Sequence, residues 1–235
     1  MKDLISAMAE EKAYVADRLK NINTSLVDRL TPYGYSNLTE YFADKQEHLF
    51  NEWIPEVYPI DVRNITADLE AAVRNEKYGI YLSYADGLYA FHGSLDIDHT
   101  LCEELGICVA ELYHTGGTII GSNADLGIEI IAPKSVGLTS GIILKKFQEI
   151  ISKYIDGVTI AENDILVNGD KVMGSMQRQI GNTFVWAAQV SFRDYTDIIT
   201  QVCNKQIVKK PSHIDSTLLT RDVLESEVIA WLQKR

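Results

Sequence analysis

Long apolar stretches are missing from this sequence, and their absence excludes membrane-spanning helices. No apolar run approaches the roughly 18 residues that a transmembrane helix needs, and the first residues do not form an apolar signal segment. We therefore expect a cytoplasmic protein that has no membrane partner.

Cysteine is also scarce. The chain has three cysteines, Cys102, Cys108 and Cys203, and no two of them form a CxxC pair. With five histidines and no recognisable ligand spacing, the sequence predicts no metal site. We expect reduced cysteines that serve core packing.

Positive charge is in short supply as well. The chain has 22 basic and 33 acidic residues, so its net charge is −11. Because binding to a phosphate backbone requires clustered lysines and arginines, we exclude nucleic acid as a partner. The shortage is uneven, since residues 1–170 carry 13 basic and 27 acidic side chains whereas residues 171–235 carry 9 and 6. An acidic partner protein is therefore expected to dock on the last third of the chain.

Apolar residues are plentiful, at 46% of 235 positions, which is enough for the core of one large domain with an appendage. Apolar residues recur at intervals of three and four in the first part of the chain, which predicts helices over residues 3–30 and 36–53. Pro55 and Pro59 then break the helical pattern. We divide the chain into a helical N-terminal extension, residues 1–65, and a second domain, residues 66–235.

Helical and strand patterns alternate in the second domain. The predicted helices cover residues 68–76, 99–105, 139–155, 195–203 and a last segment capped by Thr220. The predicted strands cover residues 78–84, 88–92, 107–113, 118–120, 126–131 and 183–192. Asp86-Gly87 predicts a hairpin between the first two strands, and the apolar stretch 183–192 predicts a central strand. The combination predicts an α+β fold, a central mixed β-sheet flanked by helices.

A further hairpin is predicted around Asn168-Gly169-Asp170, whose residues tolerate the positive φ of a tight turn. Residues 164–167 lead into this turn, and Lys171 starts the return strand. Gly174-Ser175 then interrupts that strand, and a glycine inside a strand marks a bulge or the close approach of another group. The hairpin thus presents one cation beside a spot that is free of side chain, an arrangement that suits an anionic ligand.

A second glycine-containing motif lies upstream. Thr115-Gly116-Gly117-Thr118 joins two predicted strands, and the glycines allow a ligand to approach the backbone closely. His114 stands directly before this motif and could act as a hydrogen-bond donor.

Together, the two motifs resemble the signatures of the lipoate–protein ligase and biotin–protein ligase superfamily, and the lipoate branch is the more similar. The biotin branch carries a Gly-Arg-Gly-Arg loop that has no counterpart here. The resemblance implies that Lys171 contacts the acyl carbonyl and the phosphate of an acyl-adenylate. It carries the remaining substrate-binding roles to Thr115, Gly116, Gly117, Asn163, Asp164, Gly174, Ser175 and Arg178. We add the neighbouring His114 and Thr118 as candidate binding residues.

The activity that this resemblance implies is acyl transfer through an acyl-adenylate. ATP and Mg²⁺ would activate a lipoic or octanoic acid-type molecule, and a lysine of an acidic, lipoyl-type carrier domain would accept the acyl group. Asn163 and Asp164 would then position the nucleotide or its magnesium.

The chain departs from the family pattern at the glycine motif. Leu112 and Tyr113 stand where the family has two arginines, and Thr118 stands where it has a third glycine. Each lost charge-assisted contact to phosphate is worth about 1.5–3 kcal/mol. Two alternatives therefore stay open. One is an octanoyltransferase, which takes a thioester donor and needs no ATP, with Cys108 or Cys203 as candidate nucleophile. The other is a non-catalytic binding or structural module on the same fold.

Overall fold

The computed structural model describes residues 53–92, 97–111, 118–203 and 211–233. The N-terminal helices predicted over residues 3–30 and 36–53 lie outside these ranges, apart from Trp53. Residues 112–117, which contain most of the predicted glycine motif, lie outside them as well. None of the helices in the described ranges is long and apolar enough to cross a membrane.

The larger of two sheets is mixed, and it confirms the predicted α+β fold. Its strands are, in spatial order, β1 (Glu56–Asp61), β2 (Gly79–Tyr84), β6 (Leu126–Pro133), β10 (Thr183–Val190), β9 (Asp170–Ile180), β8 (Asp164–Val167) and β7 (Val158–Ala161). Only the β1–β2 pair is parallel among these neighbours. The strand predicted to be central, β10, is the fourth of the seven, and all of its residues are buried.

Strand β1 was not expected, because Pro55 and Pro59 were interpreted only as the end of the helical pattern. Pro59 is accommodated because β1 is an edge strand, where a missing N–H donor costs little. Its pairing with β2 along residues 56–61 places part of the segment assigned above to residues 1–65 in the sheet domain. The compact unit that carries the sheet spans Asn51–Arg235, so its start lies upstream of residue 66.

The smaller sheet has three strands, in the order β4 (Cys108–Glu111), β3 (Tyr89–His92) and β5 (Ile119–Gly121). Our prediction of a hairpin around Asp86-Gly87 is wrong, because β2 pairs with β1 and β6 whereas β3 pairs with β4 and β5. Gly87 still takes a positive φ of 120°, so the local turn signal was correct. The turn carries the chain from one sheet to the other instead of folding it back.

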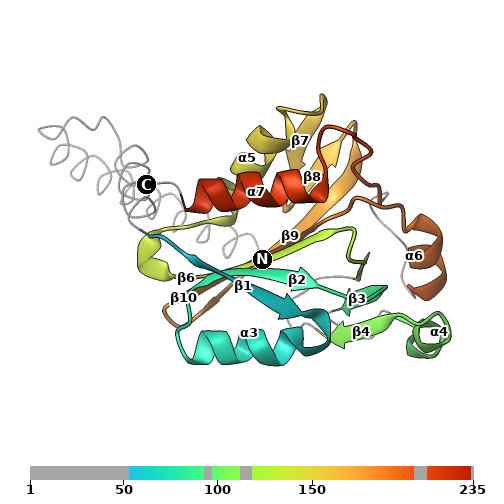
Figure 1. Ribbon diagram of the computed structural model, residues 1–235, viewed down its shortest axis with the longest axis horizontal. Helices are drawn as coiled ribbons and strands as arrows, with labels where there is room; N and C mark the ends of the chain where they lie inside the picture. Colours follow the sequence, from blue (N-terminus) through green and yellow to red (C-terminus); the bar gives the residue numbers. More distant parts are fainter. Residues whose placement is uncertain (1–52, 93–96, 112–117, 204–210, 234–235) are drawn as a thin grey trace, which may run out of the picture. The chain divides into compact units, whose positions relative to one another are not determined.

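Helices α3 (Ile65–Arg74), α5 (Ser140–Ile151) and α7 (Arg221–Leu232) cover the two faces of the larger sheet. Helices α4 (His99–Glu104) and α6 (Thr196–Val202) pack together beside the smaller sheet. Two short 3₁₀ turns are η2 (Val62–Asn64) and η3 (Lys134–Val136). Figure 1 shows α5 and α7 on one side of the sheet, and α3 with β3 and β4 on the other. The predicted caps are confirmed, since the Thr139 and Thr220 side chains accept hydrogen bonds at the starts of α5 and α7.

The apolar cores follow these layers. On the α3 side, one cluster joins the helix to both sheets and includes Leu69, Tyr81 and Phe91. On the opposite side, Phe147 of α5 stacks on Trp186 of β10 with ring centroids 5.6 Å apart. The α4–α6 end has its own cluster, which contains Cys102 and packs against the outer face of the smaller sheet.

Candidate functional site

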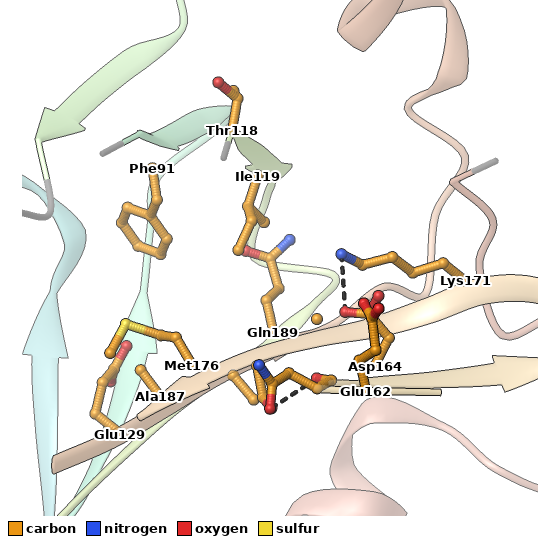
Figure 2. A pocket seen from close by; sticks show the side chains of 14 residues that line it. Phe91, Thr118, Ile119, Glu129, Glu162, Asp164, Lys171, Met176, Ala187 and Gln189 are labelled. Atoms are coloured by element: carbon orange, nitrogen blue, oxygen red, sulfur yellow. Dashed lines mark hydrogen bonds and ion pairs between the residues drawn. The ribbon is translucent and has the colours of Figure 1, made fainter. Parts of the chain in front are cut away.

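A cavity of about 370 Å³ lies between the larger sheet and the smaller one, and Figure 2 shows it from close by. Its size falls in the range of small-molecule sites. The larger sheet and its turns supply most of the wall, and β3 and β5 supply the rest. The lining residues are Phe91, Thr118, Ile119, Glu129, Glu162, Asn163, Asp164, Lys171, Gly174, Ser175, Met176, Ala187, Ala188 and Gln189.

Strand register determines which side chains form the floor, because directly paired residues point to the same face of a sheet. One row of paired residues runs across four strands through Tyr81, Glu129, Ala187 and Met176. The next row on the same face runs through Ser83, Gly127, Gln189, Gly174 and Asp164. The floor thus combines an apolar stretch with a few polar groups.

The β8–β9 hairpin closes through the predicted turn. Asn168 and Gly169 both take positive φ, 52° and 90°, as a two-residue type I′ turn requires. This turn joins Val167 directly to Asp170 and fixes the register of the two strands. The prediction that Gly174-Ser175 interrupts the return strand is wrong, because β9 runs without a break from Asp170 to Ile180.

A β-bulge in this hairpin turns Lys171 toward the cavity. Asp164 pairs with Gly174 and Leu166 pairs with Lys171, so two residues of β8 are matched by three of β9. In a regular strand, positions 171 and 174 would point to opposite faces because their separation is odd. The extra residue brings both onto the face of Asp164 and Leu166. The bulge that the glycine indicated is therefore what directs the lysine.

The Lys171 ammonium lies 3.1 Å from Oδ1 of Asp164, and Gly174 provides the space for it. A Cβ added at Gly174 would come within 2.9 Å of both Cε and Nζ of Lys171. The lysine side chain keeps 33% of its exposure, so it is held in place and still reachable by a ligand. Figure 2 shows the pair at one end of the cavity.

Asn163 and Ser175 also lie at this end. The Ser175 hydroxyl donates to the Asn163 carbonyl oxygen at 2.7 Å, and the Ser175 backbone N–H donates to the same oxygen at 2.9 Å. The two residues thus stabilise the turn that starts β8. Arg178, in contrast, is exposed farther along β9 and does not line the cavity.

The glycine motif is described only at its end. Thr118 lines the cavity at the start of β5, whereas His114, Thr115, Gly116 and Gly117 lie outside the described residues. Leu112 and Tyr113 lie outside them too. The candidate nucleophiles Cys108 and Cys203 do not line the cavity but pack against the two apolar clusters on the smaller sheet. Their position agrees with the expected packing role.

Two polar residues of the floor were missed in the sequence, Glu129 on β6 and Gln189 on β10. Both are buried, with 2% and 3% of their surface exposed. Burial raises the pKa of Glu129 to about 8, although a hydrogen bond from Ser83 opposes the rise. Burial therefore favours the protonated form of this carboxyl at neutral pH. A charged residue type inside the apolar run Leu126–Ile131 was the available signal.

The charge of the described lining fits one oxygen anion better than a triphosphate. Lys171 is the single basic residue among the described lining residues, which also include Glu129, Glu162 and Asp164. A triphosphate needs several cations or a metal to offset its charge. In the residues that the structure describes, no group of three or more His, Cys, Asp and Glu side chains could hold a metal ion.

Neither a protein-family model nor a curated protein sequence matches this chain. Solved structures do match. LipL1 of P. falciparum in complex with lipoate superposes with a TM-score of 0.63 at 12% identity, over 75% of this chain and 61% of that chain. Lipoate-protein ligase A bound with ATP superposes with a TM-score of 0.60 at 14% identity, over 77% of this chain and 85% of that chain. A bi-partite lipoate protein ligase of Thermoplasma acidophilum, described with its E2 lipoyl domain, superposes with a TM-score of 0.59 at 14% identity, over 77% of this chain and 84% of that chain.

At sequence identities this low, the similarity shows only that the proteins share a fold. The match agrees with the resemblance seen in the two sequence motifs and with the mixed seven-stranded sheet. The chain has the α+β fold of the lipoate-protein ligases, with a strongly diverged sequence.

Proposed function

We propose that this protein binds a carboxylic acid of the lipoic or octanoic class in the cavity and transfers its acyl group to a lysine of a carrier domain. The observation that carries the proposal is the placement of Lys171, which a bulge and a bare glycine direct into a cavity that also has apolar walls. Phe91, Ile119 and Met176 supply apolar surface for the acyl chain, and the ammonium meets its carboxyl end.

The chemistry of the transfer follows from this placement. The amine of the acceptor lysine attacks the acyl carbonyl carbon, the leaving group departs with its bonding electron pair, and the amine loses a proton to solvent. Negative charge develops on the carbonyl oxygen during the attack. A positioned ammonium such as that of Lys171 stabilises this charge, an effect that is worth about 3 kcal/mol for one donor.

Two acyl donors are compatible with this step. An adenylate made from ATP, with Mg²⁺, is the donor implied by the resemblance, and one structure of the same fold was solved with ATP. A thioester donor is favoured by the lining itself, because Lys171 is the one cation among its described residues and a thioester leaving group carries no phosphate at the reacting centre. The acceptor in either case is an acidic lipoyl-type domain, as expected from the charge of residues 171–235.

Calorimetric titration of octanoate and lipoate tests the binding part of this proposal. We expect both acids to bind the native protein, and Lys171→Ala to weaken binding about tenfold or more because a charge-assisted contact is lost. Lys145→Ala, on the exposed side of α5, is the matched control and should bind as the native protein does. Failure of the native protein to bind either acid would overturn the proposal.

Intact-mass analysis of a lipoyl domain tests the transfer. The domain is incubated with the protein and either lipoate, ATP and Mg²⁺, or an octanoyl thioester. A mass increase that requires Lys171 identifies the donor. Binding without any mass increase would instead indicate the non-catalytic module.

A further inference from the structure

The inner end of the cavity carries an acid that an apolar acyl chain does not need. Glu129 lies in the middle of β6 with 2% of its surface exposed, and it lines the cavity together with Met176 and Ala187. Figure 2 shows Glu129 and Met176 at one end, below the ring of Phe91, and the Lys171–Asp164 pair at the other. The cavity thus has a cation at one end and a carboxyl group at the other.

The hydrogen bonds of this carboxyl group are incomplete within the described residues. The Ser83 hydroxyl lies 3.2 Å from both Oε1 and Oε2, and its single proton can serve only one of them. Gln189, which lines the cavity between the two ends, donates from Nε2 to the Ile120 carbonyl oxygen at 2.8 Å. Its buried Oε1 has no hydrogen-bond partner among the described residues. Both side chains therefore keep acceptor capacity.

A ligand with a wholly apolar tail would fill the space beside these groups and leave their remaining acceptor capacity unsatisfied, which is costly. A ligand that ends in an amine would supply up to three donors to them. It would also let Glu129 ionise against a cation. Glu129 and Gly174 lie two strands apart across the sheet and two residues apart along the strand direction. From the usual strand spacing and rise, their backbones are about 12 Å apart. A carboxylic acid of medium chain length spans such a distance.

We propose, on the basis of the function proposed above, that the cavity selects an ω-amino carboxylic acid: Lys171 binds its carboxyl end and Glu129 binds its terminal ammonium. Glu129 is in this reading the residue that determines specificity. Lipoate and octanoate are then weaker ligands than their amine-terminated counterparts of equal length.

Calorimetry with octanoate and 8-aminooctanoate tests the selection directly. We expect the native protein to bind 8-aminooctanoate about tenfold or more tightly than octanoate, and Glu129→Gln, which preserves the shape of the side chain, to lose this preference. Glu103→Gln, on the exposed surface of α4, is the matched control and should keep it. A native protein that binds octanoate as tightly as 8-aminooctanoate overturns the inference even if the Glu129 variant does not fold.

Proton release gives a second readout that a purely structural role would not produce. At pH 7 Glu129 is mostly protonated, and an incoming ammonium would ionise it, so titrations in two buffers of different ionisation enthalpy should show about one proton released. The titratable groups near Glu129 are Tyr81 on the paired strand β2 and Tyr89 on β3 of the smaller sheet, and burial raises the pKa of both. Both stay neutral at pH 7 and do not contribute. Zero proton release would contradict the ammonium–carboxylate contact.

The two proposals fail in different ways. Binding that needs Lys171 but ignores Glu129 and the terminal amine leaves the acyl-transfer proposal standing and overturns this inference. Binding of 8-aminooctanoate that needs Glu129 but is unchanged by Lys171→Ala keeps the ammonium site and overturns the acyl-binding role of Lys171.

Discussion

The ammonium of Lys171 and the carboxylate of Asp164 are 3.1 Å apart, and they meet over the bare backbone of Gly174. The bulge in β9 and the missing side chain at position 174 are both required for this contact. Since the lysine side chain is already held in place, it loses little conformational entropy when a ligand binds it.

The space above Gly174 can be removed by one methyl group. We expect Gly174→Ala to displace the end of Lys171 and to weaken octanoate binding about tenfold, with a change in unfolding free energy below about 1 kcal/mol because the displaced atoms are the end of a flexible side chain. Calorimetry and denaturant unfolding measure the two effects. Gly141→Ala is the control, since its Cβ meets only Thr139 Oγ1 at 3.9 Å. Unchanged binding in Gly174→Ala would show that the position of Lys171 is unimportant.

Asp164 competes with an anionic ligand for the lysine. We expect Asp164→Asn to tighten octanoate binding severalfold, because the ligand carboxylate then no longer competes with the Asp164 carboxylate for the ammonium. The free energy of unfolding should change by less than about 1 kcal/mol, since Lys171 is partly exposed and such pairs contribute little. Weaker binding in this variant would indicate that the aspartate itself contacts the ligand.

The stability of the protein should depend on pH through Glu129. The folded state keeps this carboxyl protonated up to about pH 8, whereas the unfolded chain loses the proton near its ordinary pKa of 4.5. Unfolding therefore releases a proton between these values, and the stabilising contribution present below pH 4.5 is lost as the pH rises to 8. The slope is on the order of 1 kcal/mol per pH unit.

Urea unfolding across this pH range measures the effect. We expect Glu129→Gln, which cannot ionise, to show a smaller decline and to be more stable than the native protein near pH 8. Parallel stability curves for the two proteins would mean that the folded carboxyl has an ordinary pKa.

Tyr195 anchors the segment after β10 to the loop before β6. Its hydroxyl donates to Oδ2 of the buried Asp125 at 2.6 Å. We expect Tyr195→Phe to lower the free energy of unfolding by about 1–3 kcal/mol, the usual cost of leaving a buried polar group without its partner. Tyr154→Phe, whose hydroxyl bonds Glu227 near the surface, should have a much smaller effect. Equal effects of the two substitutions would contradict a special role for the buried bond.

Part of this structure could be read from the sequence because it depends on local chemistry. Asn168-Gly169 supplies the positive φ of its turn, Thr139 and Thr220 cap their helices, and the apolar stretch from Thr183 forms the buried central strand. Each of these features needs only a few neighbouring residues. The same locality explains why Gly174 indicated a bulge or the close approach of another group before any contact was known.

Predictions from local sequence were wrong where a strand pairs with a strand from a distant segment of the chain. The turn at Asp86-Gly87 forms, yet the strands on its two sides join different sheets because each finds a better-matched neighbour elsewhere. Pro59 enters a strand because that strand lies at an edge, and edge position depends on the whole sheet.

The sequence by itself determined the hairpin, the lysine after its turn and the bare glycine, since turn chemistry and strand propensity act over a few residues. Only the tertiary structure decided that Glu129 and Gln189 line the same cavity as Lys171. Their strands are brought together by pairing between segments that are tens of residues apart, and the low dielectric that keeps Glu129 protonated exists only when both sheets are packed.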